Sequence, residues 1–388
     1  MKTRRRIWLI LWILSIVGIS YFGGTISYLL FWAMTFVPIL SFIYILFVYI
    51  QFRIYQEIES RTVICKQPVP YYFTLPNETF YAFAGLSVKM FSGFSYVTDI
   101  PEDKEYELLP GDADTHYSDL ICKYRGEYEV GVKEVVITDF LGLFRFCYRL
   151  RETFKAVVLP RVIRLDELKS LKELYDFSSM ENAYEKTEAD ILTRDYIPGD
   201  ALKYIYWKAS AREQKLKVRN LTGERKREIV LAFDTQRVSE KAEEHIPLEN
   251  TLLEIVLALG NHFAEKRIPC KFLWGQQGMK QYDLEAMNQF EYFYQSISKV
   301  IFDESEKTEN LLQYVQGNMQ YMLGGTFILV THRLTDDMLG SLQLWAKEGM
   351  RVIVYLVADY ETERLERQSN SRFKLIAIPV DGNVEELL

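Results

Sequence analysis

The chain has 388 residues, a net charge of −7 at neutral pH and 49% hydrophobic residues. This length exceeds what one hydrophobic core normally organises, so two or three domains are expected. The four cysteines include no C-x-x-C pair, which excludes the common structural zinc sites and indicates reduced thiols in a cytosolic compartment.

The N-terminal region contains no charged residue from position 7 to position 51. This stretch is long enough for two membrane-spanning helices of about 20 residues each and too long for one. Because Gly23 and Gly24 lie near its middle, we predict a transmembrane helical hairpin over residues 1–55, with apolar helices at 7–22 and 27–50. A signal peptide fits less well, since bulky aromatic residues continue where small cleavage-site residues belong.

Basic residues flank the predicted hairpin at its two ends and are absent from its connecting turn. They are Lys2, Arg4, Arg5 and Arg6 before it and Arg53, Arg61 and Lys66 after it. Since positive charge stays in the cytoplasm, the pattern predicts a cell-membrane protein with two spans and cytoplasmic termini. The soluble domains are then cytoplasmic as well.

Residues 56–160 contain short runs of Val, Ile, Tyr and Phe with alternating polarity, as in YEVGVKEVVITD. Turn signals separate these runs at LPNE, LPGDAD and YRGEY. We therefore predict an all-β, immunoglobulin-like sandwich. Asp112, Asp114 and His116 alternate in this region, but they fall short of a closed metal coordination shell, so a polar turn is the preferred interpretation.

The remaining chain is predicted to contain a charged helical linker over residues 161–193 and an α/β domain over residues 194–388. Apolar strands are expected at REIVLAF, CKFLWG, TFILV, RVIVYLVA and FKLIAIPV, with amphipathic helices between most of them. This alternation is typical of a parallel sheet covered on both faces, which predicts a doubly wound fold.

The start of this last domain, RDYIPGDALKYIYWKASAREQKLKVRN, concentrates positive charge. Residues 194–227 contain ten Lys or Arg and four Asp or Glu, a net charge of +6 against −13 for the rest of the chain. Pro198 and Gly199 predict a tight turn, after which Asp200 is placed to cap a short helix that begins at Ala201 and includes Ile205.

A cationic strand is predicted after that helix. In KLKVRN, the basic residues Lys215, Lys217 and Arg219 alternate with apolar ones, so they should share one face. Two interpretations stay open. The favoured one is a structural clasp made by Arg194, Lys208 and Arg212. Their side chains would pair with Asp195, Asp200 or acidic residues of neighbouring domains. The other is a binding strip for an acidic protein or anionic lipid. Nucleic acid is disfavoured, because no aromatic platform accompanies the charge.

These residues resemble the family known as domain of unknown function 58. Its hallmark, R-x-Y-x-P-G-D and then I-x-W-K-x-S-A-R, is matched by Arg194, Tyr196, Pro198, Gly199, Asp200, Ile205, Trp207, Lys208, Ser210, Ala211 and Arg212. A second family-like element is matched by Arg125, Gly126, Tyr128, Gly131, Asp139, Gly142, Leu143 and Phe144. Family members commonly begin with a membrane hairpin, so the resemblance extends over essentially the whole chain.

The resemblance implies a C-terminal domain similar to von Willebrand factor type A domains. It also implies a non-enzymatic adaptor or scaffold in the assembly or maintenance of envelope or protein complexes. The implied partners are a MoxR-type AAA+ ATPase and a transglutaminase-like membrane protein, and no cofactor is implied. Two alternatives stay open: a metal-dependent hydrolase that uses Asp200 or Asp234, and an anionic-lipid-binding protein.

The implied type A fold makes a metal site testable. Metal-binding type A domains place D-x-S-x-S after the first strand, because a carboxylate and two hydroxyls suit one hard cation. Here Gln236 and Val238 occupy the two serine positions after Asp234, and the later strand ends at Thr331 and His332 instead of T-D-G. We expect a degraded site at Asp234 and Thr331 that holds no metal. Phosphate-loop and G-x-S-x-G motifs are also absent from the sequence, so no enzymatic activity is expected.

Overall fold

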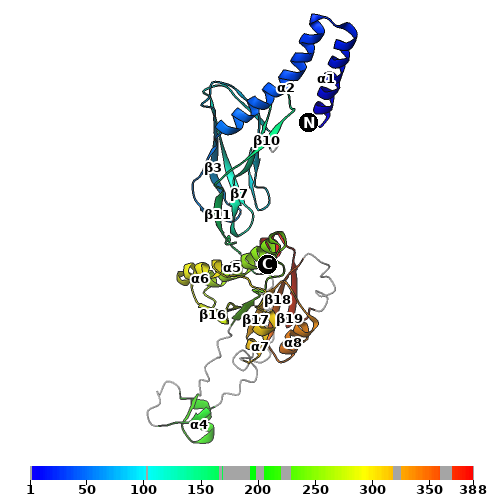
Figure 1. Cartoon of the computed structure of the whole chain (residues 1–388). Coiled ribbons are helices and arrows are strands. Elements are labelled where there is room, and N and C mark those ends of the chain that lie inside the picture. Colours follow the sequence, from blue (N-terminus) through cyan, green and yellow to red (C-terminus); the bar gives the residue numbers. More distant parts are fainter. Residues whose placement is uncertain are drawn as a thin grey trace. The chain divides into compact units, whose positions relative to one another are not determined.

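The computed structural model describes residues 2–101, 104–165, 168, 193–197, 205–219, 229–317, 325–358 and 369–387. The chain divides into two compact units, Met1–Arg161 and Val162–Leu388, and each is described by itself (Figure 1). Most of the predicted linker over residues 161–193 falls outside the described residues.

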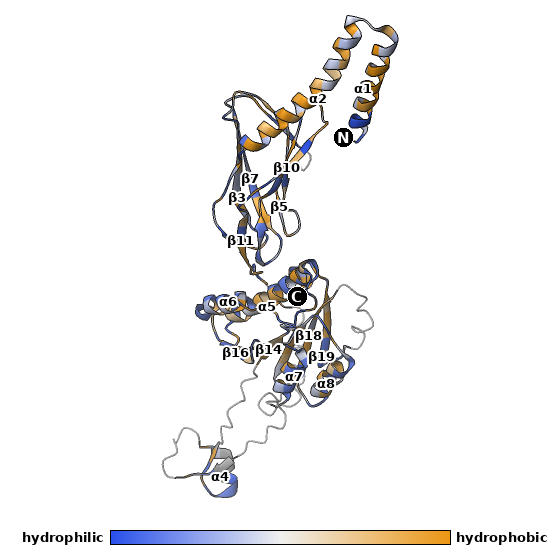
Figure 2. Ribbon diagram, in the orientation of Figure 1, coloured by the Kyte–Doolittle hydropathy of each residue, from blue (hydrophilic) through white to orange (hydrophobic). Residues whose placement is uncertain are grey.

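Two apolar helices open the first unit, α1 (Lys2–Phe22) and α2 (Thr25–Gln51). The chain reverses at Gly23, whose φ of +52° is a left-handed value that glycine adopts without strain. The break therefore falls where the paired glycines predict it. Both helices are long and apolar enough to cross a membrane by length and composition, and Figure 2 shows hydrophobic residues along both.

The C-terminal part of α2 belongs to the core of the β-sheet region. Ile45 and Val48 on α2, and Phe52 just after it, are at most 2% exposed and pack in the same hydrophobic cluster as the strands. The N-terminal part of α2 is therefore apolar and exposed, whereas its C-terminal part packs against the β-strands. This differs from the predicted apolar span over residues 27–50, because amino-acid hydrophobicity alone does not distinguish lipid from a protein core.

Strands in three sheets build the rest of the first unit, as the alternating pattern predicts. The sheet orders are β1-β3-β7-β5, β10-β9-β4-β6 and β2-β11-β8. The strands are β1 (Tyr55–Ile58), β2 (Thr62–Ile64), β3 (Pro68–Pro76), β4 (Phe83–Met90), β5 (Ser95–Val97), β6 (Glu105–Leu108), β7 (Ala113–Cys122), β8 (Gly126–Val130), β9 (Val132–Thr138), β10 (Arg145–Arg149) and β11 (Phe154–Leu159). Side chains such as Phe73, Leu86 and Val135 are buried between the sheets because alternate residues of each strand face inward.

The second unit contains a small paired segment followed by a six-stranded sheet with helices. The small segment has β12 (Thr193–Asp195), α4 (Trp207–Glu213) and β13 (Lys217–Arg219). The larger part has β14 (Ile229–Phe233), α5 (Ala242–Lys266), β15 (Cys270–Gly275), β16 (Met279–Leu284), the 3-10 helix η3 (Met287–Gln289), α6 (Phe290–Ser298), α7 (Thr308–Gly317), β17 (Thr326–Thr331), α8 (Asp336–Lys347), β18 (Arg351–Val357), β19 (Phe373–Ile378) and α10 (Val384–Leu387).

The large sheet has the order β16-β15-β14-β17-β18-β19. All of its neighbouring strands are parallel except β16, which runs antiparallel to β15 at the edge. The five predicted apolar segments form β14, β15, β17, β18 and β19. β16 and α7 have no clear hydrophobic pattern in the sequence, because MKQYDL and TENLLQYVQG are short and largely polar.

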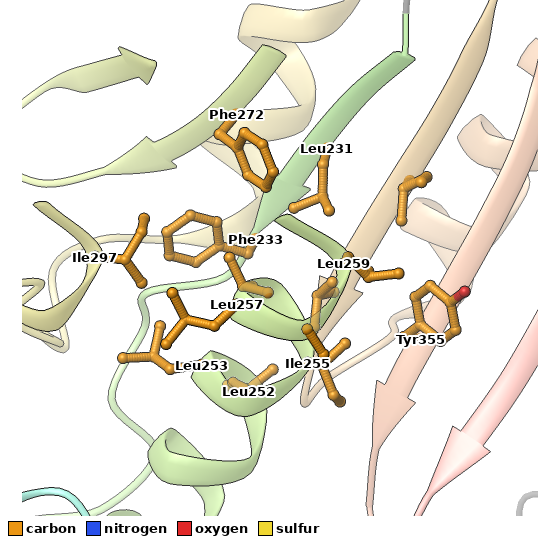
Figure 3. Packing of buried hydrophobic residues seen from close by; sticks show 14 of the residues in the cluster. Leu231, Phe233, Leu252, Leu253, Ile255, Leu257, Leu259, Phe272, Ile297 and Tyr355 are labelled. Carbon is orange, nitrogen blue, oxygen red and sulfur yellow. The ribbon is translucent and has the colours of Figure 1, made fainter. Parts of the chain in front are cut away.

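Helices cover both faces of this sheet. Leu231 and Phe233 of β14 pack in one cluster with residues of α5 and α6, as Figure 3 shows for Leu253, Leu257 and Ile297. The alternate residues of β14 belong to a second cluster, which contains side chains of α7 and α8. Because both faces are buried, the strands are apolar at nearly every position instead of alternating.

Candidate functional site

The carboxyl ends of β14 and β17 meet at the point where the chain changes direction across the sheet. From β14 the chain continues to β15 on one side, whereas β17 and β18 extend the sheet on the other. In open α/β sheets, ligands bind outside the carboxyl ends of the strands at such a switch point. The polar residues that follow β14 and end β17 are therefore the candidate site.

Asp234 follows β14 directly, and its side chain is buried. Its Oδ1 accepts a hydrogen bond of 2.8 Å from the backbone N–H of Gln236, and its Oδ2 accepts one of 2.9 Å from the hydroxyl of Thr331. Thr331 also accepts a bond from the backbone N–H of Arg333. Asp234 and Thr331, which are separated by 97 residues in the chain, are thus joined directly.

His332 lies beside the same carboxylate. Its Nδ1 is 3.1 Å from Oδ2 of Asp234 but lacks hydrogen-bonding geometry, so the contact is electrostatic. Burial lowers the pKa of His332 from its usual value, while the nearby charge of Asp234 opposes this shift. Burial therefore favours the neutral form of the ring.

A second charged pair lies close to this network. The Nε of Arg237 is 2.9 Å from Oε1 of Glu249, whose side chain on α5 is nearly fully buried. Glu249 also contributes to the electrostatic environment of His332. A buried carboxylate needs such a partner, since an unpaired buried charge is strongly destabilising.

A cavity of about 230 Å³ adjoins Asp234 at this edge of the sheet. Its lining includes Thr235, Glu306, Lys307, Thr308 and Asn310. Thr308 begins α7, and its hydroxyl is buried without a hydrogen-bond partner. An unsatisfied buried hydroxyl beside a cavity is a group that a bound polar ligand can complete.

The residues at this edge do not fit the metal set of type A domains. Hydroxyls are missing at Gln236 and Val238, and both oxygens of Asp234 already accept bonds within the protein. A hard cation requires several oxygen ligands, and Thr308 supplies one additional hydroxyl. Among the described residues, no group of three or more His, Cys, Asp or Glu side chains is arranged to hold a metal ion.

The polar turn preferred for Asp112, Asp114 and His116 is wrong for the last two residues, which lie on a strand. Asp114 and His116 lie on one face of β7, where Oδ2 of Asp114 is 2.9 Å from Nε2 of His116. Asp112 precedes the strand. The His116 ring also packs against Phe73 and Tyr106, so it is a partly buried strand residue.

The cation-rich motif forms a strand, a helix and a second strand. β12 and β13 pair antiparallel, with Arg194 opposite Val218. The predicted helix from Ala201 is wrong at its C-terminal part, because Ile205 forms a bridge with Val218 and α4 begins at Trp207. Ile205 is extended because it pairs with β13, although the spacing of the apolar residues favours a helix. Pro198, Gly199 and Asp200 lie outside the described residues, so their predicted turn and cap stay predictions.

Lys217 holds this segment together. Its ammonium lies 2.8 Å from Oδ1 of Asp195 on β12 and 3.0 Å from Oε2 of Glu213 on α4. The hydrogen bond with Lys217 lowers the pKa of Asp195. The hydroxyl of Ser210 also accepts a bond from the backbone N–H of Lys217. Lys217 thus makes a clasp within this segment, and the pairing predicted for Arg194 and Lys208 stays a prediction, because their side chains lie outside the described ones.

The other predicted residues of the motif differ in exposure. Arg212, Lys215 and Trp207 are exposed, and Tyr196 is partly buried. The backbone N–H of Tyr196 donates to the carbonyl of Leu216. The side chains of Arg194, Lys208 and Arg219 are not described. Lys215 precedes β13, so the predicted continuous cationic strand face is shorter than KLKVRN indicates.

The second family-like element supports the first unit. Gly126 begins β8, and the hydroxyl of Tyr128 donates to the carbonyl of Tyr124. Burial raises the pKa of Tyr128. Asp139 accepts a hydrogen bond of 2.5 Å from Ser41 of α2, and Gly142 adopts a left-handed φ of +68°. Arg125, adjacent to Gly126, also makes interactions within the described chain.

Residues 192–266 match the family described as "Protein of unknown function DUF58". The chain carries a DUF58 segment. No curated protein matches the chain. The match begins at the clasp and extends to the C-terminus of α5, so it includes β14 and Asp234. The matched segment therefore contributes β14 and Asp234 to the site, whereas β17 and Thr331 lie outside it.

Solved structures resemble this chain over limited regions. A von Willebrand factor type A protein from Catenulispora acidiphila is 10% identical over 42% of this chain and 40% of its own, with a TM-score of 0.31. Trypsin-activated alpha-2-macroglobulin from Escherichia coli is 15% identical over 39% of this chain and 9% of its own, with a TM-score of 0.21. A cohesin module from Clostridium perfringens is 9% identical over 28% of this chain and 96% of its own, with a TM-score of 0.17. The chain covers less than half of the first two proteins.

Sequence reasoning missed Thr308, Glu249 and Arg237 at this site. Thr308 begins a helix that was not predicted, and nothing in its local sequence connects it with Asp234. Glu249 lies in a predicted helix, where a carboxylate is normally expected on the solvent face. His332 was recognised only as a departure from T-D-G.

Proposed function

We propose that this DUF58 chain is a membrane-anchored adaptor with no catalytic activity of its own. The α1–α2 hairpin anchors it, an immunoglobulin-like sandwich spaces it, and a doubly wound, type A-like domain presents the edge formed by β14 and β17. The cytoplasmic partner is a MoxR-type AAA+ ATPase, working beside a transglutaminase-like membrane protein in assembly or maintenance of envelope or protein complexes. The family resemblance supplies the identity of these partners.

The cavity beside Asp234 carries this proposal. It lies at the switch point of the sheet and is lined by groups of both charge signs, Glu306 and Lys307, together with the buried hydroxyl of Thr308. Such a mixed lining suits hydrogen bonds to a polar side chain from a partner protein. The carboxylate of Asp234 is already hydrogen-bonded twice, which favours a structural role over proton transfer.

The membrane anchor rests on the two apolar helices and on the basic residues around them. Positive charge at Arg4, Arg5 and Arg53 favours cytoplasmic ends for both helices. Both soluble units then lie in the cytoplasm, where an AAA+ ATPase can reach them. Reporter fusions at the N- and C-termini should both be active on the cytoplasmic side.

Co-purification of the ATPase with the full-length chain tests the adaptor role. Thr308→Val with Lys307→Glu should reduce the recovered ATPase, because the pair removes a polar contact and reverses a charge at the cavity. Lys266→Glu is the matched control, since Lys266 ends α5 at the opposite edge of the sheet. Unchanged recovery with the cavity variant and wild-type folding would reject this edge as the interface.

Arg212→Glu with Lys215→Glu examines the exposed cations of the clasp segment. Loss of ATPase recovery in this variant alone would move the interface to the DUF58 motif. If instead both sets of variants retain the ATPase, the proposed partner is wrong or binds elsewhere. The salt bridges of Lys217 stay intact in this variant, so the folding of the segment is preserved.

The metal-dependent hydrolase is the second candidate, and the observation in its favour is the oxygen of Thr308 in the cavity next to Asp234. Thermal unfolding with Mg²⁺, Mn²⁺ or Ca²⁺ separates it from the adaptor, because an ion that binds only the folded state raises the melting temperature. The adaptor predicts no such shift. A shift that Asp234→Asn abolishes would favour the hydrolase.

A further inference from the structure

Three chain reversals at one end of the sandwich each expose an apolar side chain. Phe80 lies between β3 and β4, Leu109 between β6 and β7, and Phe140 between β9 and β10. Their exposed fractions are 90%, 65% and 58%. Register places the three reversals at the same end, since Pro76 pairs with Ala113, Phe83 with Leu108 and Leu86 with Ile137. The exposed groups thus belong to one surface.

Buried hydrogen bonds give these reversals a defined structure. The side-chain amide of Asn77, which is 1% exposed, donates to the carbonyl oxygens of Tyr81, Leu108 and Leu109 at 2.9, 3.2 and 3.0 Å. Asp139 accepts bonds from Ser41 and from the backbone N–H of Phe144. Loops with a defined structure that expose large apolar side chains indicate a binding surface. Contact of these side chains with water is unfavourable, and binding removes it.

The helical hairpin leaves the sandwich at this same end. The hydroxyl of Tyr44 on α2 donates to the carbonyl of Ala82 at 2.7 Å, and its ring packs against Phe140 with 5.6 Å between ring centroids. On α1, Nε of Arg5 donates to the carbonyl of Leu143 at 2.6 Å. The reversals therefore lie level with the start of the apolar part of α1.

The lengths of the helices place this level near a membrane surface. The apolar part of α1 covers residues 7–22, which rise about 24 Å at 1.5 Å per residue, less than the ~30 Å of a bilayer core. The indole N–H groups of Trp8 and Trp12 donate to Met34 and Thr35, so α2 beyond Ser41 extends past the start of this apolar part. A short span draws its flanking residues toward the lipid headgroups.

We infer that this end of the sandwich binds the cytoplasmic leaflet of the bilayer, with Phe80, Leu109 and Phe140 inserted among the lipid headgroups and upper acyl chains. The inference rests on the proposed membrane anchor and extends it from the hairpin to the sandwich. Exposed acidic residues Glu78 and Asp112 lie in the same reversals, so the apolar side chains, and not the charge of these loops, supply the contact of the reversals with lipid. The insertion fixes how the sandwich stands on the membrane.

Site-specific fluorescence on the full-length chain in phosphatidylcholine vesicles tests this surface. In a Cys147→Ser background, which removes the exposed native cysteine and leaves Cys65, Cys122 and Cys270 buried, Phe80→Cys is labelled with an environment-sensitive dye. Its emission should shift to the blue and be quenched by lipids that carry a spin label in the upper acyl chain. High salt should leave the quenching unchanged.

Two further positions make the outcomes distinguishable. Leu30→Cys, on the exposed surface of α2 within the hairpin, reports the membrane anchor itself. Ile64→Cys, exposed at the end of β2, is the matched apolar control away from the three reversals. Quenching at positions 30 and 80 but not at 64 is the expected result.

Quenching at position 30 alone would overturn the lipid-binding surface and leave the anchor standing. No quenching at either position would reject the anchor. A blue shift at position 80 without lipid quenching would show that protein covers these residues, which also overturns the inference.

Discussion

At the scale of single residues, Asp234 and Thr331 form the centre of the β14–β17 site. Their hydrogen bond joins the ends of two adjacent parallel strands, and it is fully buried. The threonine hydroxyl donates to Asp234, so it provides within the protein the partner that a buried carboxylate needs.

Thr331→Val tests this role. Valine keeps the shape but leaves one oxygen of Asp234 with no hydroxyl donor, so the free energy of unfolding should fall by about 1–3 kcal/mol. Denaturant unfolding of the full-length chain measures the change. Thr331→Ser keeps the hydroxyl and should cost less; equal losses for the two variants would contradict the hydrogen bond's role.

His332 predicts a pH dependence of stability. Burial lowers its pKa in the folded state, with Asp234, Arg333 and Glu249 as charged neighbours, so near pH 6.5 the unfolded chain binds more protons at this residue. The stability that the neutral His332 contributes is present above pH 6.5 and is lost as pH falls toward the folded-state pKa. The free energy of unfolding should change by at most about 1.4 kcal/mol per pH unit over this range. The free energies of unfolding of wild type and His332→Gln, measured against pH, should therefore diverge on acidification. Parallel curves would contradict a lowered pKa of His332 in the folded state.

At the scale of elements, α2 has two environments along one continuous helix. Toward its N-terminus it pairs with α1, and toward its C-terminus Ile45 and Val48 enter the hydrophobic core of the β-strands of the first unit. Ser41 marks the change, where its hydroxyl binds the buried Asp139. A hydrophobic sequence suits both environments, which explains why residue hydrophobicity did not locate the boundary.

Ile45→Ala should destabilise the first unit by about 2–5 kcal/mol, because it removes a buried side chain and leaves a cavity. Hydrogen exchange of the strands, measured on the full-length chain in nanodiscs, reports the loss. Leu46→Ala is the control on the next residue of the same helix, since Leu46 is largely exposed. Equal effects at both positions would show that lipid contact, and not the sandwich core, governs this half of α2.

At the scale of the whole molecule, the two units have separate cores. The cluster that includes α2 and the strands of the first unit ends at Val158, and the clusters on the two faces of the large sheet begin at Ile163 and at Val230. Each unit therefore buries its own apolar surface. This agrees with a division between Arg161 and Val162 along the chain.

A fragment of residues 162–388 should fold alone as a consequence. Its thermal unfolding should be cooperative, with a midpoint within a few degrees of that of the same unit in the full chain, because no core residue is lost. Calorimetry and circular dichroism would measure this. A fragment without a cooperative transition would show that the first unit is required for the fold of the second.

Much of the fold could be predicted because hydrophobic patterns are local. The hairpin break follows from Gly23 and Gly24, and the buried parallel strands follow from runs such as TFILV. The edge strand β16 and helix α7 could not be found this way, because their sequences are short and polar. Ile205 was placed in a helix by its spacing, but pairing with Val218, a tertiary contact, decided its conformation.

The sequence by itself determined the apolar hairpin, the β-rich and α/β regions, the DUF58 motif and the loss of the hydroxyls expected after Asp234. Each of these depends on residue type and on spacing within a short segment. Only the tertiary structure decided which distant groups meet: Asp234 with Thr331 and the Thr308 cavity, Lys217 with Asp195, and Ser41 with Asp139. Such pairings depend on strand order and helix packing, which bring together residues that no local pattern connects.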